Sequence, residues 1–297
     1  MTVPSSTSSE SSSESSGDEA SAPSSAPSSA LASAARAGEQ QQRNLYRRYG
    51  PAGPVPWALR QTLIGLAVTL IPWLTLTIGA LAASPQTAQP TKRLPLASDL
   101  AAGITIFILS AVIEGAFLLA PAYYALLRVA PGSAWRERLA SLGLRRTALL
   151  PAAGLTLAGA VVALVGSAAY SAIIQAIHAP LQTNADQLAQ QAQYAPFTTL
   201  GALATAVFVA PFCEEVFFRG FSFAGLLRGV PVWPALMLSA LIFAVAHADL
   251  GSFIPLAFIG LILGYARWRT GSIWPGMLIH ALNNGVAALF LLPFIFH

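Results

Sequence analysis

The chain has 297 residues, of which 55% are hydrophobic and only 9% charged, whereas about a quarter of the residues of a soluble globular domain are charged. This composition excludes an ordinary cytosolic enzyme and indicates a membrane protein. The net charge of +4, with no block of basic residues, argues against a nucleic-acid partner, and the single cysteine, Cys213, excludes an intrachain disulfide framework and a thiolate zinc cluster.

The first 50 residues are predicted to form a disordered cytoplasmic tail. Residues 2–38 are dominated by Ser, Ala and Pro and hold almost no large apolar side chains, whose burial could offset the entropy of ordering. They also lack the basic start and the apolar run of a signal peptide, so we expect the tail to be retained.

Apolar runs that are long enough to cross a bilayer follow the tail, since a spanning helix needs about 20 residues. We predict seven spans, at about 58–83, 100–127, 147–178, 198–222, 231–248, 252–268 and 272–296. Most basic residues of the connecting loops fall on one side of these spans: Arg60, Arg128, Arg136, Arg138, Arg145, Arg146, Arg219, Arg228, Arg267 and Arg269. Because cytoplasmic loops are enriched in Lys and Arg, the N-terminus is predicted to be cytoplasmic. We therefore expect an all-α, polytopic transmembrane helix bundle in the lipids of the plasma membrane, with N-terminal transmembrane helices over residues 55–197 and a second region over residues 198–297.

Ionisable side chains inside spans are functional candidates, because an unpaired charge costs about 3 kcal/mol at the centre of a membrane helix. In the fourth span, Glu214 and Glu215 are adjacent, so they point about 100° apart on a helix and need different roles. Glu215 lies four residues before Arg219, the favourable order for a helical ion pair, and is predicted to hold that arginine. Glu214 is then left unpaired and is predicted to act as a general base or acid.

Two later spans each add a histidine. Phe243 lies four residues before His247 in the fifth span, on the same face, and is expected to shield the site. His280 lies one turn before Asn284 in the last span, and an imidazole and an amide on one face can both donate hydrogen bonds to a single oxygen. The predicted catalytic residues are therefore Glu214, His247, His280 and Asn284.

Two chemistries fit these four residues. A carboxylate and two imidazoles match the ligand count of a catalytic zinc ion, which Glu214, His247 and His280 would hold. A metal-free scheme uses the same atoms: Glu214, assisted by His247, deprotonates a water molecule, while His280 and Asn284 stabilise the oxyanion. Both schemes hydrolyse an amide bond within the membrane, and the sequence leaves the choice between them open.

The depths of the two proposed water-activating residues do not match on straight helices. Counted from Arg228, Glu214 lies about 14 residues back and His247 about 19 residues forward, or about 21 and 28 Å. We expect a segment along the interface between residues 217 and 228, or a tilt of the fifth span, to bring the two side chains level.

Glu114, in the second span, is predicted to be a protonated or hydrogen-bonded carboxyl, with Ser110 one turn away, rather than Tyr123, as its local partner. A transporter that uses Glu114, Glu214 and His247 as a proton relay is disfavoured, because the chain lacks the internal symmetry expected of such a protein.

The three motifs resemble those of the CPBP intramembrane proteases, which include the CAAX prenyl endopeptidases and bacterial Abi-type membrane proteases. The motifs are Glu214-Glu215 with Arg219, Phe243 with His247, and His280 with Asn284, and residues 271–276 look like the family's approach to the last motif. The resemblance covers about residues 198–290. It implies a catalytic core over residues 198–297 with a buried site open to the cytoplasm.

The activity that this resemblance implies is that of a metallo- or glutamate-dependent endopeptidase. Its substrate would be a membrane-associated peptide or protein, with CAAX-type prenylated chains as the best-known example in the family. Some members act in bacteriocin immunity or as scaffolds, so a non-catalytic membrane protein of either kind is the alternative.

Overall fold

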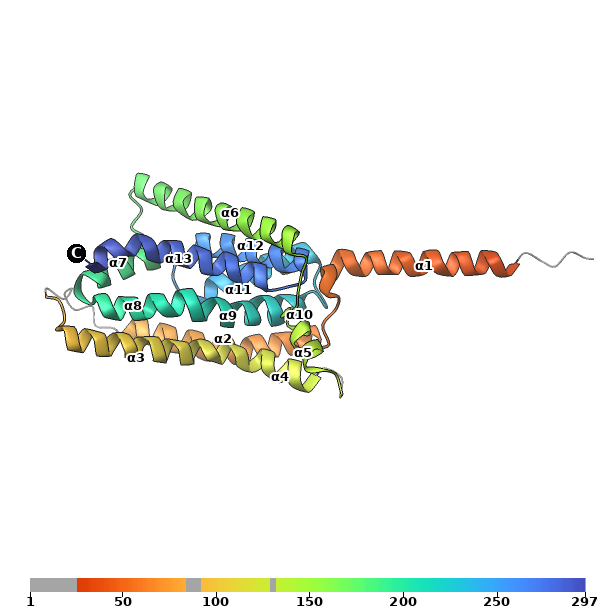
Figure 1. The fold of residues 1–297 in the computed structure, drawn as a ribbon, viewed down its shortest axis with the longest axis horizontal. Coiled ribbons are helices and arrows are strands. Elements are labelled where there is room, and N and C mark those ends of the chain that lie inside the picture. The colour runs from red at the N-terminus through yellow and green to blue at the C-terminus, as the bar shows by residue number, and fades with distance from the viewer. Residues whose placement is uncertain (1–25, 84–91, 129–131, 297) are drawn as a thin grey trace, which may run out of the picture. The chain divides into compact units, whose positions relative to one another are not determined.

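The computed structural model describes residues 26–83, 92–128 and 132–296, and all the regular structure in these residues is helical (Figure 1). This confirms the predicted all-α class. By its internal contacts the chain divides into two units, residues 1–42 and residues 43–297. The candidate site residues all lie in the second unit.

Helix α1 (Ala26–Tyr49) stands in place of part of the predicted disordered tail. Residues 30–42 are rich in Ala and Gln, which are strong helix formers, and residues 31–47 are exposed. The prediction of disorder considered only the apolar surface that the segment could bury, whereas local helix propensity does not depend on burial. The predicted disorder of residues 1–25 lies outside the described residues.

Five helical segments of the described chain are long and apolar enough to cross a bilayer. They are α2 (Leu59–Ala83), α3 with α4 (Leu96–Gly115 and Leu119–Arg128, joined by the turn η2, Ala116–Leu118), α6 (Leu149–Ala176), the run from α8 (Pro196–Ala204) to α10 (Ala224–Leu226), and α13 (Trp274–Phe296). These segments establish an integral membrane protein.

The predicted spans at 231–248 and 252–268 are not confirmed. Helix α11 (Val232–Ala246) has 15 residues. That gives a length of about 22 Å, which is short for about 30 Å of hydrocarbon. Helix α12 (Phe253–Thr270) carries Arg267 and Arg269 in its last turn, and these charges lower its mean hydropathy below that of a spanning segment. The sequence pattern marked apolar runs but overestimated how much of each run is apolar helix.

The central span contains two stretches of wide π-helical turns, η3 (Thr205–Val209) and η4 (Glu215–Phe223), with α9 (Ala210–Glu214) between them. Such turns are rare and are often found at functional sites. Pro211, at the start of α9, has no amide hydrogen, so one hydrogen bond of a regular helix cannot form there. The two glutamates of the first motif therefore lie where the backbone changes from an α-helix to the wider turn.

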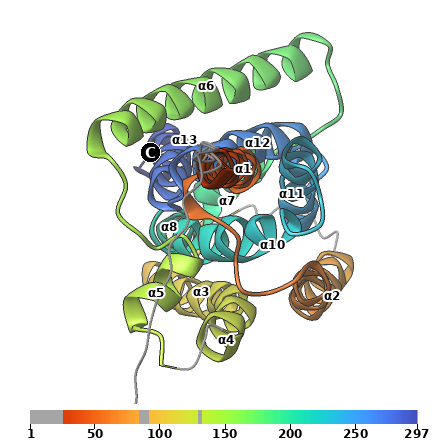
Figure 2. The same ribbon diagram turned by 90° about the vertical axis from the view of Figure 1, so that its right-hand side faces the viewer.

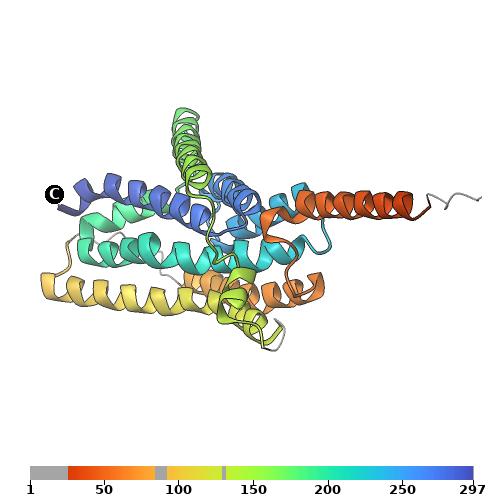
Figure 3. The same ribbon diagram turned by 45° about the vertical axis from the view of Figure 1, so that its right-hand side comes forward.

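The other helices of residues 43–297 surround this central span. In the end-on view of Figure 2, α2 and α3–α4 lie on one side, and α11, α12 and α13 lie on the other, with α6 outside against α12 and α13. Figure 3 shows α13 running beside α8 and α9, with which it is in contact. The short helices α5 (Trp135–Ser141) and α7 (Asn184–Tyr194) belong to the connections. A cluster of fully or almost fully buried aromatic rings packs around the central span: Trp57, Phe117, Phe217, Phe218 and Phe221.

Asp99, a residue that the sequence did not single out, attaches α3 to the start of α8. Its carboxylate accepts hydrogen bonds from the backbone N–H of Phe197 at 2.8 Å, from the N–H of Thr198 at 2.9 Å and from the Thr198 hydroxyl at 2.7 Å. A negative charge at a helix N-terminus is favourable, because it satisfies amide donors that have no partner inside the helix. A Cβ on Gly201 would lie 2.2 Å from the carbonyl oxygen of Gly103, so the two helices also touch backbone to backbone. This attachment fixes the span that carries the glutamates.

Candidate active site

Glu215 and Arg219 form a fully buried ion pair within η4. The distance from Arg219 Nη1 to Glu215 Oε1 is 2.7 Å, and both side chains are 0% exposed. Arg219 also donates a hydrogen bond from Nη2 to the carbonyl oxygen of Gly260 in α12, at 3.3 Å. The ion pair that the spacing predicted is thereby confirmed, and it connects the central span to α12.

Gly276 in α13 lies directly against the Glu215 carboxylate. A Cβ at position 276 would lie 2.7 Å from Oε2 of Glu215, closer than side-chain atoms ordinarily approach. The absence of a side chain therefore lets the Glu215 carboxylate lie against α13. This contact accounts physically for a glycine in the segment that leads into the last motif.

Glu214 faces His247. Its Oε2 atom is buried, has no hydrogen-bond partner, and lies 3.9 Å from Nε2 of the imidazole. The other ring nitrogen, Nδ1, lies 2.8 Å from the carbonyl oxygen of Phe243. A carbonyl oxygen can only accept, so Nδ1 carries a proton, and Nε2 is the ring atom that faces the carboxylate; in a neutral ring Nε2 is an acceptor. The gap between Nε2 and Glu214 Oε2 is too long for a direct hydrogen bond.

The expected mismatch in depth is absent because α11 begins only at Val232. The residues between Leu226 and Val232 form a turn, so they add little to the depth of His247. His247 follows a helix of 15 residues rather than the 19 counted from Arg228. Neither the interfacial segment nor the tilt that the sequence suggested is needed to bring the two side chains together.

His280 lies beside Glu215 instead of Glu214. Its Nδ1 atom is 3.7 Å from Oε1 of Glu215, and the side chain is 5% exposed. The ring of Phe243 contacts both histidines, with its centroid 4.7 Å from that of His247 and 5.7 Å from that of His280. The guanidinium carbon of Arg219 lies 4.2 Å from the same centroid. Phe243 therefore contacts residues of both polar groups, His247 of the group with Glu214, and Arg219 and His280 of the group with Glu215.

Asn284 supports the backbone of the central span. Its Nδ2 atom donates a hydrogen bond to the carbonyl oxygen of Ala206, in the π-helical turn η3, at 2.8 Å. The wide turn leaves this carbonyl available to a side chain. One hydrogen of the Asn284 amide therefore forms a hydrogen bond between α13 and η3.

Glu114 lies near the same site. It is close enough to Glu214 and to Cys213 to interact electrostatically with both. Its Oε2 atom is enclosed without a hydrogen-bond partner, so in the described chain neither the predicted partner Ser110 nor Tyr123 donates to this atom. The sequence could have signalled this proximity only through the polar character of Glu114, because nothing in the spacing relates the second span to the fourth.

The predicted zinc ligands do not gather in this arrangement. Within the described residues, no three side chains of His, Cys, Asp or Glu could hold one metal ion together. His280 faces Glu215, so Glu214 and His247 lack a third protein ligand, whereas a catalytic zinc ion usually has three. This donor set does not fit the zinc site that the sequence allowed.

Residues 196–286 match the family model for type II CAAX prenyl endopeptidase Rce1-like proteins. The matched segment runs from the start of α8 into α13 and includes every residue of the three motifs. No curated protein and no solved structure shows significant similarity to the chain. Over residues 196–286, the match supports the similarity to the CPBP family of CAAX-type intramembrane proteases that the three motifs indicate.

Proposed function

We propose that the protein is an endopeptidase that cleaves a membrane-associated, CAAX-type prenylated chain at the cytoplasmic side of the plasma membrane. The observation that carries the proposal is the position of His247, whose Nε2 faces the unpartnered Oε2 of Glu214 at 3.9 Å. A water molecule can donate one hydrogen bond to each of these acceptors at about 2.8 Å, so the pair suits water activation.

In the proposed reaction, Glu214 takes a proton from this water while the hydroxide oxygen attacks the carbonyl carbon of the scissile amide. The carbonyl electrons move to the oxygen, which becomes an oxyanion. His280 is the donor that we assign to this oxyanion, and Asn284 contributes only through its second amide hydrogen, because the first is bonded to Ala206. When the C–N bond breaks, Glu214 returns its proton to the leaving amine.

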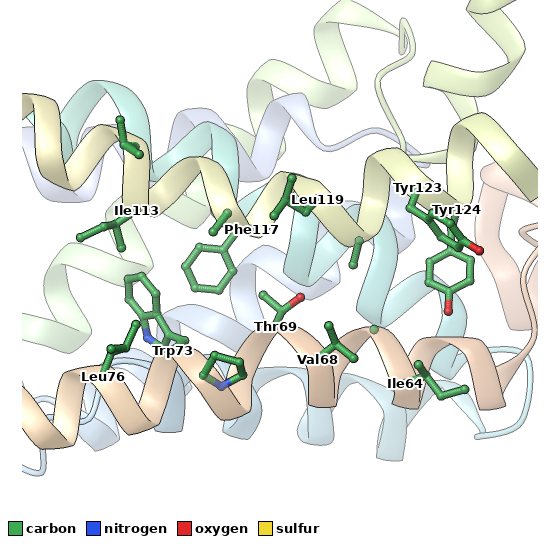
Figure 4. Close-up of a pocket in the computed structure, with 15 residues that line it drawn as sticks. Ile64, Val68, Thr69, Trp73, Leu76, Ile113, Phe117, Leu119, Tyr123 and Tyr124 are labelled. Atoms are coloured by element: carbon green, nitrogen blue, oxygen red, sulfur yellow. The ribbon is translucent and has the colours of Figure 1, made fainter.

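An apolar cavity of about 830 Å³ supports a substrate that carries a lipid chain (Figure 4). Residues of α2 and of α3–α4 line it, among them Val68, Trp73, Ile113 and Phe117. Trp73 donates a hydrogen bond from Nε1 to the carbonyl oxygen of Ala246, the residue before His247, at 2.7 Å. The cavity therefore adjoins the wall of the site, and its volume is in the range of ligand pockets.

The test is cleavage of a fluorogenic prenylated peptide by proteoliposomes that contain the full-length protein. Glu214→Gln and His247→Gln should each lower the rate at least about 100-fold, the usual contribution of general acid–base catalysis, with unchanged thermal unfolding. Glu137→Gln, which changes an exposed acid in α5 to its amide, is the matched control and should cleave at the normal rate. The same peptide without its prenyl group should show a higher KM.

Normal cleavage by the Glu214→Gln variant would refute the proposed mechanism. The alternative of a non-catalytic immunity or scaffold protein predicts a different pattern. In that case the wild-type protein would not cleave the peptide, and its cellular phenotype would persist in the Glu214→Gln variant.

A further inference from the structure

Arg267, in the last turn of α12, is a second buried arginine. The residue is 3% exposed, and its Nε atom is enclosed without a hydrogen-bond partner. The guanidinium packs against Gly143, where a Cβ would lie 2.8 Å from Nε and 3.1 Å from the central carbon. The chain thus leaves room for this side chain but provides no partner for its Nε–H.

Arg145 lies in the same region, where residues 143–145 meet Pro51 and the end of α12; we call this region the junction. The hydroxyl of Ser272 donates to the carbonyl oxygen of Arg145 at 2.8 Å, and the N–H of Ile273 donates to that of Gly143 at 3.0 Å. The Arg145 guanidinium donates from Nη1 to the carbonyl oxygen of Pro51 at 3.3 Å. It is also close enough to Arg267 for the two positive charges to repel each other. Three segments of chain therefore bring two guanidinium groups to one place.

No carboxylate compensates these charges in the part of the chain that the structure describes. Arg219, which is equally buried, has the carboxylate of Glu215 at 2.7 Å, whereas no ion pair within 4.0 Å involves Arg267 or Arg145. A buried guanidinium keeps its charge, and an unpaired buried charge is strongly unfavourable. The contrast between Arg219 and Arg267 indicates that an anion from outside the chain belongs beside Arg267.

The chemistry of the junction selects the kind of anion. A guanidinium presents a planar fork of donors that matches two oxygens of a phosphate, and two guanidinium groups provide two positive charges. The junction lies at the end of the bundle where the loops carry most of the arginines, the end predicted to face the cytoplasm. Anionic lipid headgroups lie at that level of the membrane and attract such residues.

We infer that Arg267 and Arg145 form a binding site for a phosphate group, supplied by the headgroup of an anionic lipid. The site is separate from the glutamates and histidines of the catalytic region. Its occupant neutralises the two guanidinium groups and ties together α12, residues 143–145 and Pro51. The inference does not depend on the proposed proteolysis.

The experiment measures thermal unfolding of the full-length protein in neutral detergent with three additives, namely phosphatidylglycerol, phosphatidylcholine and inorganic phosphate. Phosphatidylglycerol should raise the unfolding temperature of the wild-type protein by several degrees, and phosphatidylcholine should not. Arg267→Gln should lose this shift. Arg269→Gln, which removes an exposed arginine two positions later in the same helical turn, is the matched control and should keep it.

Arg145→Gln is the second variant, because Arg145 is only partly buried and its loss should not prevent folding. It should reduce the shift, and native mass spectrometry should find phosphatidylglycerol retained by the wild-type and Arg269→Gln proteins but not by this variant. An equal shift with inorganic phosphate alone would identify free phosphate as the source of the same group. A shift that is unchanged in both Arg267→Gln and Arg145→Gln, or that is missing from the wild-type protein with all additives, would overturn the inference.

Discussion

Replacement of Glu215 by glutamine tests whether the buried ion pair holds the site together. Glutamine keeps the shape of the side chain and one oxygen acceptor, so the main loss is the negative charge opposite Arg219. Both partners are 0% exposed and lie 2.7 Å apart. Removing one partner of such a pair leaves an uncompensated buried charge and costs about 3–5 kcal/mol. At about 2–4 °C per kcal/mol for a chain of this size, the unfolding temperature should fall by on the order of 10 °C.

The assay is thermal unfolding of the detergent-solubilised full-length protein, followed by circular dichroism. Arg219→Met should destabilise the protein by a similar amount, because it leaves the Glu215 carboxylate unpaired. The double variant Glu215→Gln/Arg219→Met should lose less stability than the two single variants together, since it buries no unpaired charge. Glu137→Gln serves as the exposed control. Equal unfolding temperatures for Glu215→Gln and the wild-type protein would show that the pair does not stabilise the fold.

Four further perturbations have defined expected outcomes. Asp99→Ala removes three hydrogen bonds at the start of α8 and should cost about 3 kcal/mol in a chemical or thermal unfolding experiment; a wild-type unfolding curve would contradict this role. Gly276→Ala places a Cβ 2.7 Å from Glu215 Oε2 and should lower the free energy of unfolding by about 1–3 kcal/mol and reduce cleavage; an unchanged stability would show that this close contact is unimportant. Trp73→Phe loses the hydrogen bond to Ala246 and should cost about 1 kcal/mol and slow cleavage, with no change in either as the opposing result. Cleavage should persist in chelator-treated protein that elemental analysis shows to be free of metal, and restoration of a lost activity by zinc would instead support the metal scheme.

Local spacing was enough to predict the contacts that lie within one helix or follow from it. The four-residue separation of Glu215 and Arg219 gave the ion pair, and the same separation of Phe243 and His247 gave their contact on α11. These relations depend on the helical repeat, which a sequence carries directly. The all-α class followed for a similar reason, from the length and composition of the apolar runs.

The relations between helices could not be predicted in the same way. The sequence groups His280 with Glu214, but the structure places it with Glu215, because which of two adjacent carboxylates faces α13 depends on how the helices pack and not on the spacing within one helix. Asp99 was missed because the second apolar run was placed at residues 100–127, so this carboxylate counted as part of a loop. The charge of Arg267 groups it with the arginines of the cytoplasmic loops, although it lies at the end of the predicted span 252–268 and is almost fully buried.

The two adjacent glutamates can have different roles because, in the described chain, Arg219 forms its ion pair with Glu215 and not with Glu214. Arg219 neutralises Glu215 at 2.7 Å, so the second carboxylate adds no net charge beside the first. Two uncompensated carboxylates at this depth would repel each other and also the oxyanion that forms during amide hydrolysis. With Glu215 paired to Arg219, Glu214 is the carboxyl that faces His247, and the carboxylate beside His280 is one that a guanidinium already compensates. The buried ion pair therefore supports the proposed chemistry by removing a second uncompensated carboxylate from the site.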